Sequence, residues 1–199
     1  MKVKERIKLV LGAVTILLLL SGCSTSKPSL ELISAAVEIT DDEEKVGGVG
    51  ITSGDREGEF IYAQTLIYDF VIKNTGKSTL GGAEKPNFQT FDYADGIKVS
   101  IEPKQELLEV STESLGINIY DAEDNNLGRE EVSTAVLEPN QEGKYSFKFK
   151  LGATEENPDL VLTPPAEQLD QLRALAMQAH VVVTVEDEEI ARFDLSDWE

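Results

Sequence analysis

Residues 144–151 have the sequence KYSFKFKL, and this stretch decides the fold class. Three lysines and one serine alternate there with four apolar side chains, which are Tyr145, Phe147, Phe149 and Leu151. Successive side chains of a β-strand point to opposite faces, so the alternation puts the apolar groups on one face and the lysines on the other. The stretch therefore predicts a strand that is buried on one side and open to solvent on the other.

Further short strands are predicted on both sides of this stretch. In residues 60–72 six side chains share one parity, which are Phe60, Tyr62, Leu66, Tyr68, Phe70 and Ile72. Lys73-Asn74-Thr75-Gly76 then ends that strand with turn-forming residues. Turn clusters at 92–96, 121–128 and 139–143 separate the remaining candidates, which are 30–39, 97–101, 115–121 and 132–137. Seven or more short strands with this spacing predict a mainly β protein, built as an antiparallel sandwich or barrel.

One segment, 163–179, predicts an α-helix. Thr163-Pro164-Pro165 resembles a helix start, and apolar residues then recur at helical spacing up to Ala179. A hairpin should follow, with strands at 181–185 and 190–195 on either side of Asp187-Glu188. We expect this helix to cross the end of the sandwich or to cover one of its edges.

The N-terminus carries a secretion signal. A basic start is followed by the apolar run 9–20 and then by Leu20-Ser21-Gly22-Cys23. The run is shorter than the roughly 20 residues that a membrane-spanning helix needs. The box resembles that of bacterial lipoproteins, which implies that the Cys23 thiol is alkylated with diacylglycerol and that the chain is cut just before it. The alternative is an ordinary signal peptide whose cysteine happens to lie near the cleavage site.

This resemblance divides the chain into a lipoprotein signal peptide at 1–22, a lipidated tether at 23–29 and one domain at 30–199. It implies a lipid-anchored protein on the extracytoplasmic face of the cell membrane. Cys23 is the one cysteine of the 199 residues, so the mature domain is expected to lack disulfides and to depend on its core.

The charge is strongly negative. The chain has 18 lysines and arginines against 37 aspartates and glutamates, a net charge of −19. Loss of residues 1–22 removes four cations and one anion, which leaves a charge of −22 on the mature chain. Nucleic acid would be repelled, so it is excluded as a partner. The acidic domain should also stand off anionic headgroups on its tether.

Three motifs resemble those of small bacterial lipoproteins with an immunoglobulin-like domain. They are the strand and turn at 70–76, the acidic segment 120–127, and Leu137-Glu138-Pro139 to Gly143 followed by the aromatic strand. The resemblance spans 30–199 and implies an immunoglobulin-like antiparallel β-sandwich in a tethered module without catalytic residues. The cysteine pair and buried tryptophan of antibody domains are missing, because Trp198 lies near the C-terminus. The helix at 163–179 is also an addition to the simplest version of that fold.

The acidic loop at 121–125 is the strongest candidate for a metal site. Asp121, Glu123, Asp124 and Asn125 offer oxygen ligands of the kind that calcium takes. However, the sixth position counted from Asp121 is Asn126, where an EF-hand needs glycine. We favour a hairpin turn with solvated carboxylates, and we interpret the runs 41–44 and 186–189 as solvated surface. No metal site or cofactor is therefore predicted.

The other motifs also favour structural roles. Gly76-Lys77-Ser78 lacks the glycine of a phosphate loop five positions earlier, where Val71 stands. Glycines 47, 48, 50 and 54 do not have the dinucleotide-binding spacing and predict a loop. His180, the one histidine, opens a valine-rich strand without a nearby histidine or cysteine and is interpreted as structural or exposed.

Two classes of function remain. The first is a non-catalytic binding or assembly module, tethered to the membrane through lipid on Cys23 and contacting a protein or another component of the cell envelope. The alternative is a carboxylate-dependent extracytoplasmic enzyme or a calcium-binding protein, because many carboxylates are present although nothing selects a catalytic pair. We expect the first, with no enzymatic activity.

Overall fold

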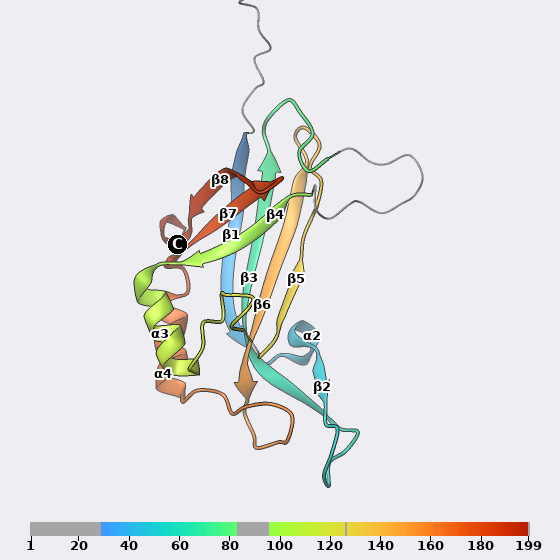
Figure 1. Cartoon of the computed structure of the whole chain (residues 1–199), viewed down its shortest axis with the longest axis vertical. Coiled ribbons are helices and arrows are strands. Elements are labelled where there is room, and N and C mark those ends of the chain that lie inside the picture. The colour runs from blue at the N-terminus through green and yellow to red at the C-terminus, as the bar shows by residue number, and fades with distance from the viewer. Residues whose placement is uncertain (1–28, 83–95, 126, 199) are drawn as a thin grey trace, which may run out of the picture.

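The computed structural model describes residues 29–82, 96–125 and 127–198 (Figure 1). It contains eight strands, three α-helices and a short 3₁₀ helix among these residues. In chain order they are β1 (Leu30–Thr40), α2 (Glu43–Val46), β2 (Gly48–Gly50), β3 (Phe60–Asn74), β4 (Lys98–Pro103), α3 (Gln105–Leu115), β5 (Arg129–Val132), β6 (Glu142–Ala153), α4 (Ala166–Leu175), β7 (Ala179–Val185), β8 (Glu188–Asp194) and η1 (Leu195–Asp197).

The strands form two antiparallel sheets in two layers. The long sheet has the order β1-β3-β6-β5, and β2 pairs with the first residues of β3. The short sheet has the order β4-β7-β8. In Figure 1 the short sheet lies beside the upper half of the long sheet, and α3 and α4 lie below it beside the lower half. The prediction of a mainly β protein with antiparallel sheets is confirmed.

The core lies between these layers and has the alternation seen in the sequence. Tyr145, Phe147, Phe149 and Leu151 are at most 1% exposed. On β3, Phe70 stands opposite Tyr145 and Tyr68 stands opposite Phe147. Val181 and Val183 of β7 and the buried leucines of α3 and α4 belong to the same cluster. Burial of this one apolar face is what joins the sheets and helices into one domain.

A buried pair of phenols ties the helices to the long sheet. The Tyr68 hydroxyl donates to the carbonyl of Ala176 at the end of α4, 2.9 Å away, and lies 3.0 Å from the Tyr120 hydroxyl. Burial raises the pKa of both phenols, so both stay protonated and can donate. Both polar groups are therefore satisfied inside the core.

Helix α4 confirms the predicted helix but is shorter than 163–179. It begins after Pro165 and ends at Leu175, since the chain turns through a backbone hydrogen bond from Gln178 to Leu175. The predicted hairpin is present as β7 and β8. Glu186 and Asp187, at its turn, both have positive φ, as a tight two-residue hairpin connection requires.

The prediction of a strand at 115–121 is wrong, and so is the expectation that the chain has a single helical segment. Residues 105–115 form α3, which buries Leu107 and ends at Gly116 with φ of 74°. Glycine tolerates this left-handed conformation, so it stops the helix where the sequence pattern had suggested the start of a strand. The segment 120–127 therefore follows a helix and does not join two strands as a hairpin.

Three smaller predictions need correction. Part of the acidic run 41–44 belongs to α2, where the Asp42 carboxylate caps the helix by accepting from the Glu44 N–H and Val46 is buried. The strand expected at 132–137 lies earlier, at 129–132. Beyond it the Thr134 hydroxyl takes the place of a strand partner, because it donates to the Lys144 carbonyl and accepts from the Lys144 N–H. The loop expected at glycines 47–54 contains β2, and the ring of Phe60 packs over Gly48.

Candidate binding surface

The outer face of the long sheet carries the side chains that alternate with the core residues. On β6 these are the lysines and serine of the stretch 144–151, and on β3 they include Asp69 and Val71. At the lower end α2 contacts β3, and the outward-facing Ile67 is buried there. The rest of this face, above α2, has no element packed on it among the described residues.

A groove of about 420 Å³ runs across the open part of this face. Small side chains form its floor, because β1 supplies Ser34 and Ala36 and β6 supplies Ser146. Val132 of the edge strand β5 stands beside Ser146 and is 62% exposed. An exposed apolar side chain beside an apolar groove is typical of surfaces that bind a partner.

Ion pairs surround the groove. Lys45 of α2 lies 2.7 Å from Glu38 of β1, and Lys73 lies 3.7 Å from Glu142. Glu130 of β5 lies 4.0 Å from Lys148 and 3.8 Å from Lys150. All are partly exposed, so each contributes little to stability, but together they keep this face free of the acidic excess that the chain carries elsewhere.

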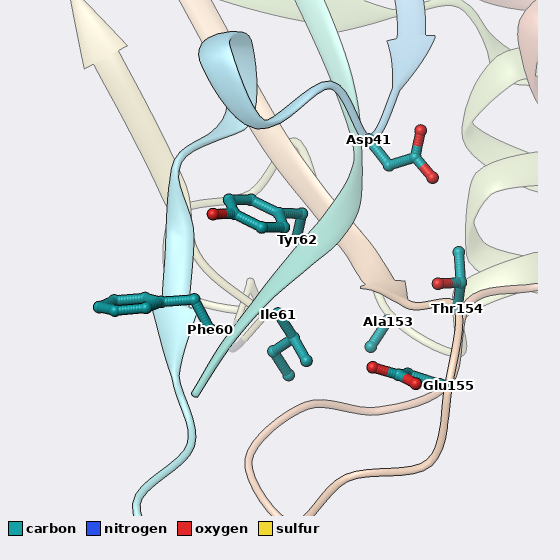
Figure 2. Close-up of a pocket in the computed structure, with 7 residues that line it drawn as sticks. All are labelled: Asp41, Phe60, Ile61, Tyr62, Ala153, Thr154 and Glu155. Carbon is teal, nitrogen blue, oxygen red and sulfur yellow. The ribbon is translucent and has the colours of Figure 1, made fainter. Parts of the chain in front are cut away.

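A second hollow, of about 220 Å³, lies at the start of β3 (Figure 2). Figure 2 shows the carboxylates of Asp41 and Glu155 at opposite ends of it, on the other side of the β3 ribbon from the rings of Phe60 and Tyr62. Glu155 is also paired with Arg56, 2.7 Å away. One of the two carboxylates is therefore already engaged by a guanidinium.

The acidic loop uses its polar groups to hold its own backbone. Asp121 accepts from the Glu123 N–H at 2.8 Å, while the Asn125 side chain donates to the Ile119 carbonyl and accepts from the Leu127 N–H. Glu123 and Asp124 are exposed. In residues 29–82, 96–125 and 127–198, no group of three or more histidine, cysteine, aspartate or glutamate side chains is placed to hold a metal ion.

Divalent cations are therefore expected to stabilise the chain only by screening its negative charge. At matched ionic strength, magnesium and calcium should raise the melting temperature equally, and the double variant Asp121→Asn/Asp124→Asn should show the same shifts. Thermal unfolding in sodium, magnesium and calcium chloride measures this. A rise of several degrees with calcium alone, lost in the double variant, would instead establish a calcium site in this loop.

His180 belongs to a polar cluster where β4, β7 and β8 meet. Its Nε2 lies 3.7 Å from Asp194, which accepts hydrogen bonds from Lys104 at 2.8 Å and from the Ser196 hydroxyl at 2.6 Å. The hydrogen bond from Lys104, followed by those from Ser196, holds the pKa of Asp194 well below its ordinary value. Because the serine donates to the aspartate and not to the histidine, the cluster lacks the arrangement of a catalytic triad.

The turn Gly76-Lys77-Ser78 is held by a buried side chain. The Asn74 amide donates to the carbonyls of Ser78 and Leu137, and its oxygen accepts from the Gly76 N–H. No helix follows this turn in the described residues before 83. The segment therefore closes β3 and does not cradle a phosphate.

Cys23 lies outside the described residues, so the lipid site predicted from the sequence is not located by the structure. Within the described residues no helix is both long and apolar enough to cross a membrane. Comparison with protein-family models, with curated proteins and with solved structures gives no match. Function is therefore inferred from this chain's own sequence and surfaces.

Proposed function

We propose that the chain is a lipoprotein anchored through Cys23 on the extracytoplasmic face of the cell membrane, and that it is a non-catalytic binding or assembly module of the cell envelope. The observation that carries this proposal is the open groove on the outer face of the long sheet, with Val132 exposed beside it. An exposed apolar groove on a rigid sheet suits a protein contact, because the sheet holds its side chains in fixed positions.

We further propose that residues 30–199 form an immunoglobulin-like sandwich. In that fold the strands A, B, E and D form one sheet and C, F and G the other. The long sheet, β1-β3-β6-β5, and the short sheet, β4-β7-β8, follow the same order when β2 is set aside. Under this correspondence α3 is inserted between strands C and D and α4 between strands E and F, which supports the resemblance seen in the sequence.

The position of β1 indicates how the anchored domain would be oriented relative to the membrane. β1 begins at Leu30, directly after the tether, and runs the length of the long sheet (Figure 1). The strands would therefore stand away from the membrane, and the outer face of the long sheet would be open to the side. A partner on the same membrane could reach it there.

The anchor is tested in cells that produce the full chain and are grown with a labelled fatty acid, by measuring the label carried by the chain. Label is expected in the wild type and should be lost in Cys23→Ala, because only the thiol can be alkylated. The variant should also be released from the membrane fraction. Equal membrane binding of the variant, together with a wild type that carries no lipid, would contradict the anchor.

The binding role is tested by crosslinking on the same cells, with the anchor in place. Val132→Glu should reduce the crosslinked species several-fold, whereas Val161→Glu should leave them unchanged. Val161 is a matched control, since it is 54% exposed but lies outside the groove. If both variants crosslink like the wild type, the groove is not the contact surface.

A further inference from the structure

We infer that the outer face of the long sheet binds the same face of a second copy of this chain, related to the first by a two-fold axis. The inference rests on the proposed function in one respect, since it takes the same face as the contact surface. It adds the identity of the partner. Three observations support it: the charge of the face, its shape, and the end of the molecule at which the tether begins.

The face is nearly balanced in charge, whereas the chain is not. The register of the strands brings four lysines and five carboxylates to this face: Lys73, Lys144, Lys148 and Lys150, and Glu31, Glu38, Asp69, Glu130 and Glu142. The whole chain has a net charge of −19. Two copies are repelled through most of their surfaces, so a nearly balanced face is where they can approach each other. Similar numbers of both signs favour neither a strongly acidic nor a strongly basic partner.

The shape of the face is complementary to itself. Ala36, Asp69, Ser146 and Val132 lie in one row across β1, β3, β6 and β5. An axis parallel to the strands, passing between β3 and β6, sets β5 of one copy against β1 of the other. Val132 then projects onto Ala36 of the second copy, where the groove is floored by small side chains, and the reverse contact forms by symmetry.

The same axis pairs opposite charges at the upper end of the face. Lys73 and Glu142 lie in one row on β3 and β6. The axis places Lys73 of one copy opposite Glu142 of the other, so each group meets a charge of opposite sign. The contact is therefore attractive at this row, while Val132 and Ala36 form an apolar contact at each lateral edge of the interface.

The direction of this axis also suits two anchored chains. It keeps the Leu30 ends of both copies at the same end of the pair, so both tethers can reach one membrane (Figure 1). The open part of the face, above α2, spans about 17 Å along the strands and about 19 Å across them. This gives about 650 Å² over both copies, the size of a weak contact, so the pair should be weak in solution and favoured where the anchor concentrates the chains.

The test is thiol crosslinking in intact cells that produce the full chain. Val132→Cys combined with Ala36→Cys is expected to give a band of twice the chain mass with a crosslinker of about 8 Å. The yield should be at least tenfold above that of either single variant. A crosslinker is needed because packed sheets lie about 10 Å apart, beyond the reach of a disulfide. Within one copy the two positions are three strands apart, about 14 Å, so the pair cannot link internally.

A second test exchanges the charges at positions 73 and 142 and measures the same crosslinked yield. Added to the double-cysteine chain, Lys73→Glu should lower the crosslinked yield several-fold, and Glu142→Lys added to it should restore the yield. The combination of Val161→Cys with Ala36→Cys should give only the background of the single variants, including any that comes from Cys23.

Two results would overturn the inference. One is a double-cysteine yield no greater than that of the single variants. The other is an adduct of Val132→Cys with a different protein in place of the dimer band. Membrane fractionation of the same cells separates this failure from failure of the anchor, since loss of the anchor moves the chain to the soluble fraction whatever bands form.

Discussion

Replacing Phe147 by alanine is expected to lower the free energy of unfolding by about 3 to 5 kcal/mol. Phe147 is 1% exposed at the centre of β6. It stands opposite Tyr68, its ring centroid lies 6.3 Å from that of Phe70, and the Arg129 guanidinium lies 5.8 Å above its ring. The substitution removes the whole ring from a layer shared by both sheets, and strands on either side cannot close over the cavity. Denaturation with urea, monitored by circular dichroism, measures the loss.

Lys148→Ala is the matched control, because it changes the next residue on the opposite face of the same strand. Its Nζ donates to the Lys45 carbonyl and lies 4.0 Å from Glu130. Both contacts are exposed, so the change should cost less than about 0.5 kcal/mol. Similar losses for the two variants would mean that the chain does not bury one face of β6, and the sandwich would have to be abandoned.

Strands with one polar and one apolar face were predictable from the sequence, because burial of one face leaves a period of two. β6 is the clearest example, and β7 and β8 were located by the valines and the turn at Asp187. Helix α3 was missed for two physical reasons. Its N-cap is Lys104, whose side chain makes no capping hydrogen bond, so the usual start signal is missing. Its buried face also includes Ser111, whose hydroxyl donates to the Leu108 carbonyl. A serine at a buried position interrupts the helical spacing of apolar residues by which a helix is recognised in a sequence.

The proposed binding face was beyond prediction because it depends on strand order. Ala36, Asp69, Ser146 and Val132 are far apart in the sequence, and only the pairing of β1, β3, β6 and β5 puts them in one row. A shift of one residue in the register of any one strand would turn that strand's member of the row to the core. The sequence does contain one sign of this face, since the lysines of 144–151 required the outer side of β6 to be open to solvent.

Gly152, at the end of β6, is a position where the backbone itself requires glycine. It has φ of +130°, and a Cβ there would lie 2.7 Å from the Thr163 nitrogen and 2.8 Å from the Val161 oxygen. Both atoms are engaged, because the Thr163 N–H donates to Ala153 and the Ala153 N–H donates to the Val161 carbonyl. These two hydrogen bonds join the segment that precedes α4 to the end of the long sheet.

Gly152→Ala should therefore combine backbone strain with the loss of one or both hydrogen bonds, and we expect it to lower the free energy of unfolding by about 2 to 4 kcal/mol. Urea denaturation measures the change. Gly54→Ala is the control, because Gly54 has φ of +89° but open space around its Cβ position, so it should cost only about 1 kcal/mol of conformational strain. If the two variants lose the same stability, conformational strain alone explains both. The close approach of residues 161–163 to β6 would then not contribute to holding α4 in place beneath the short sheet.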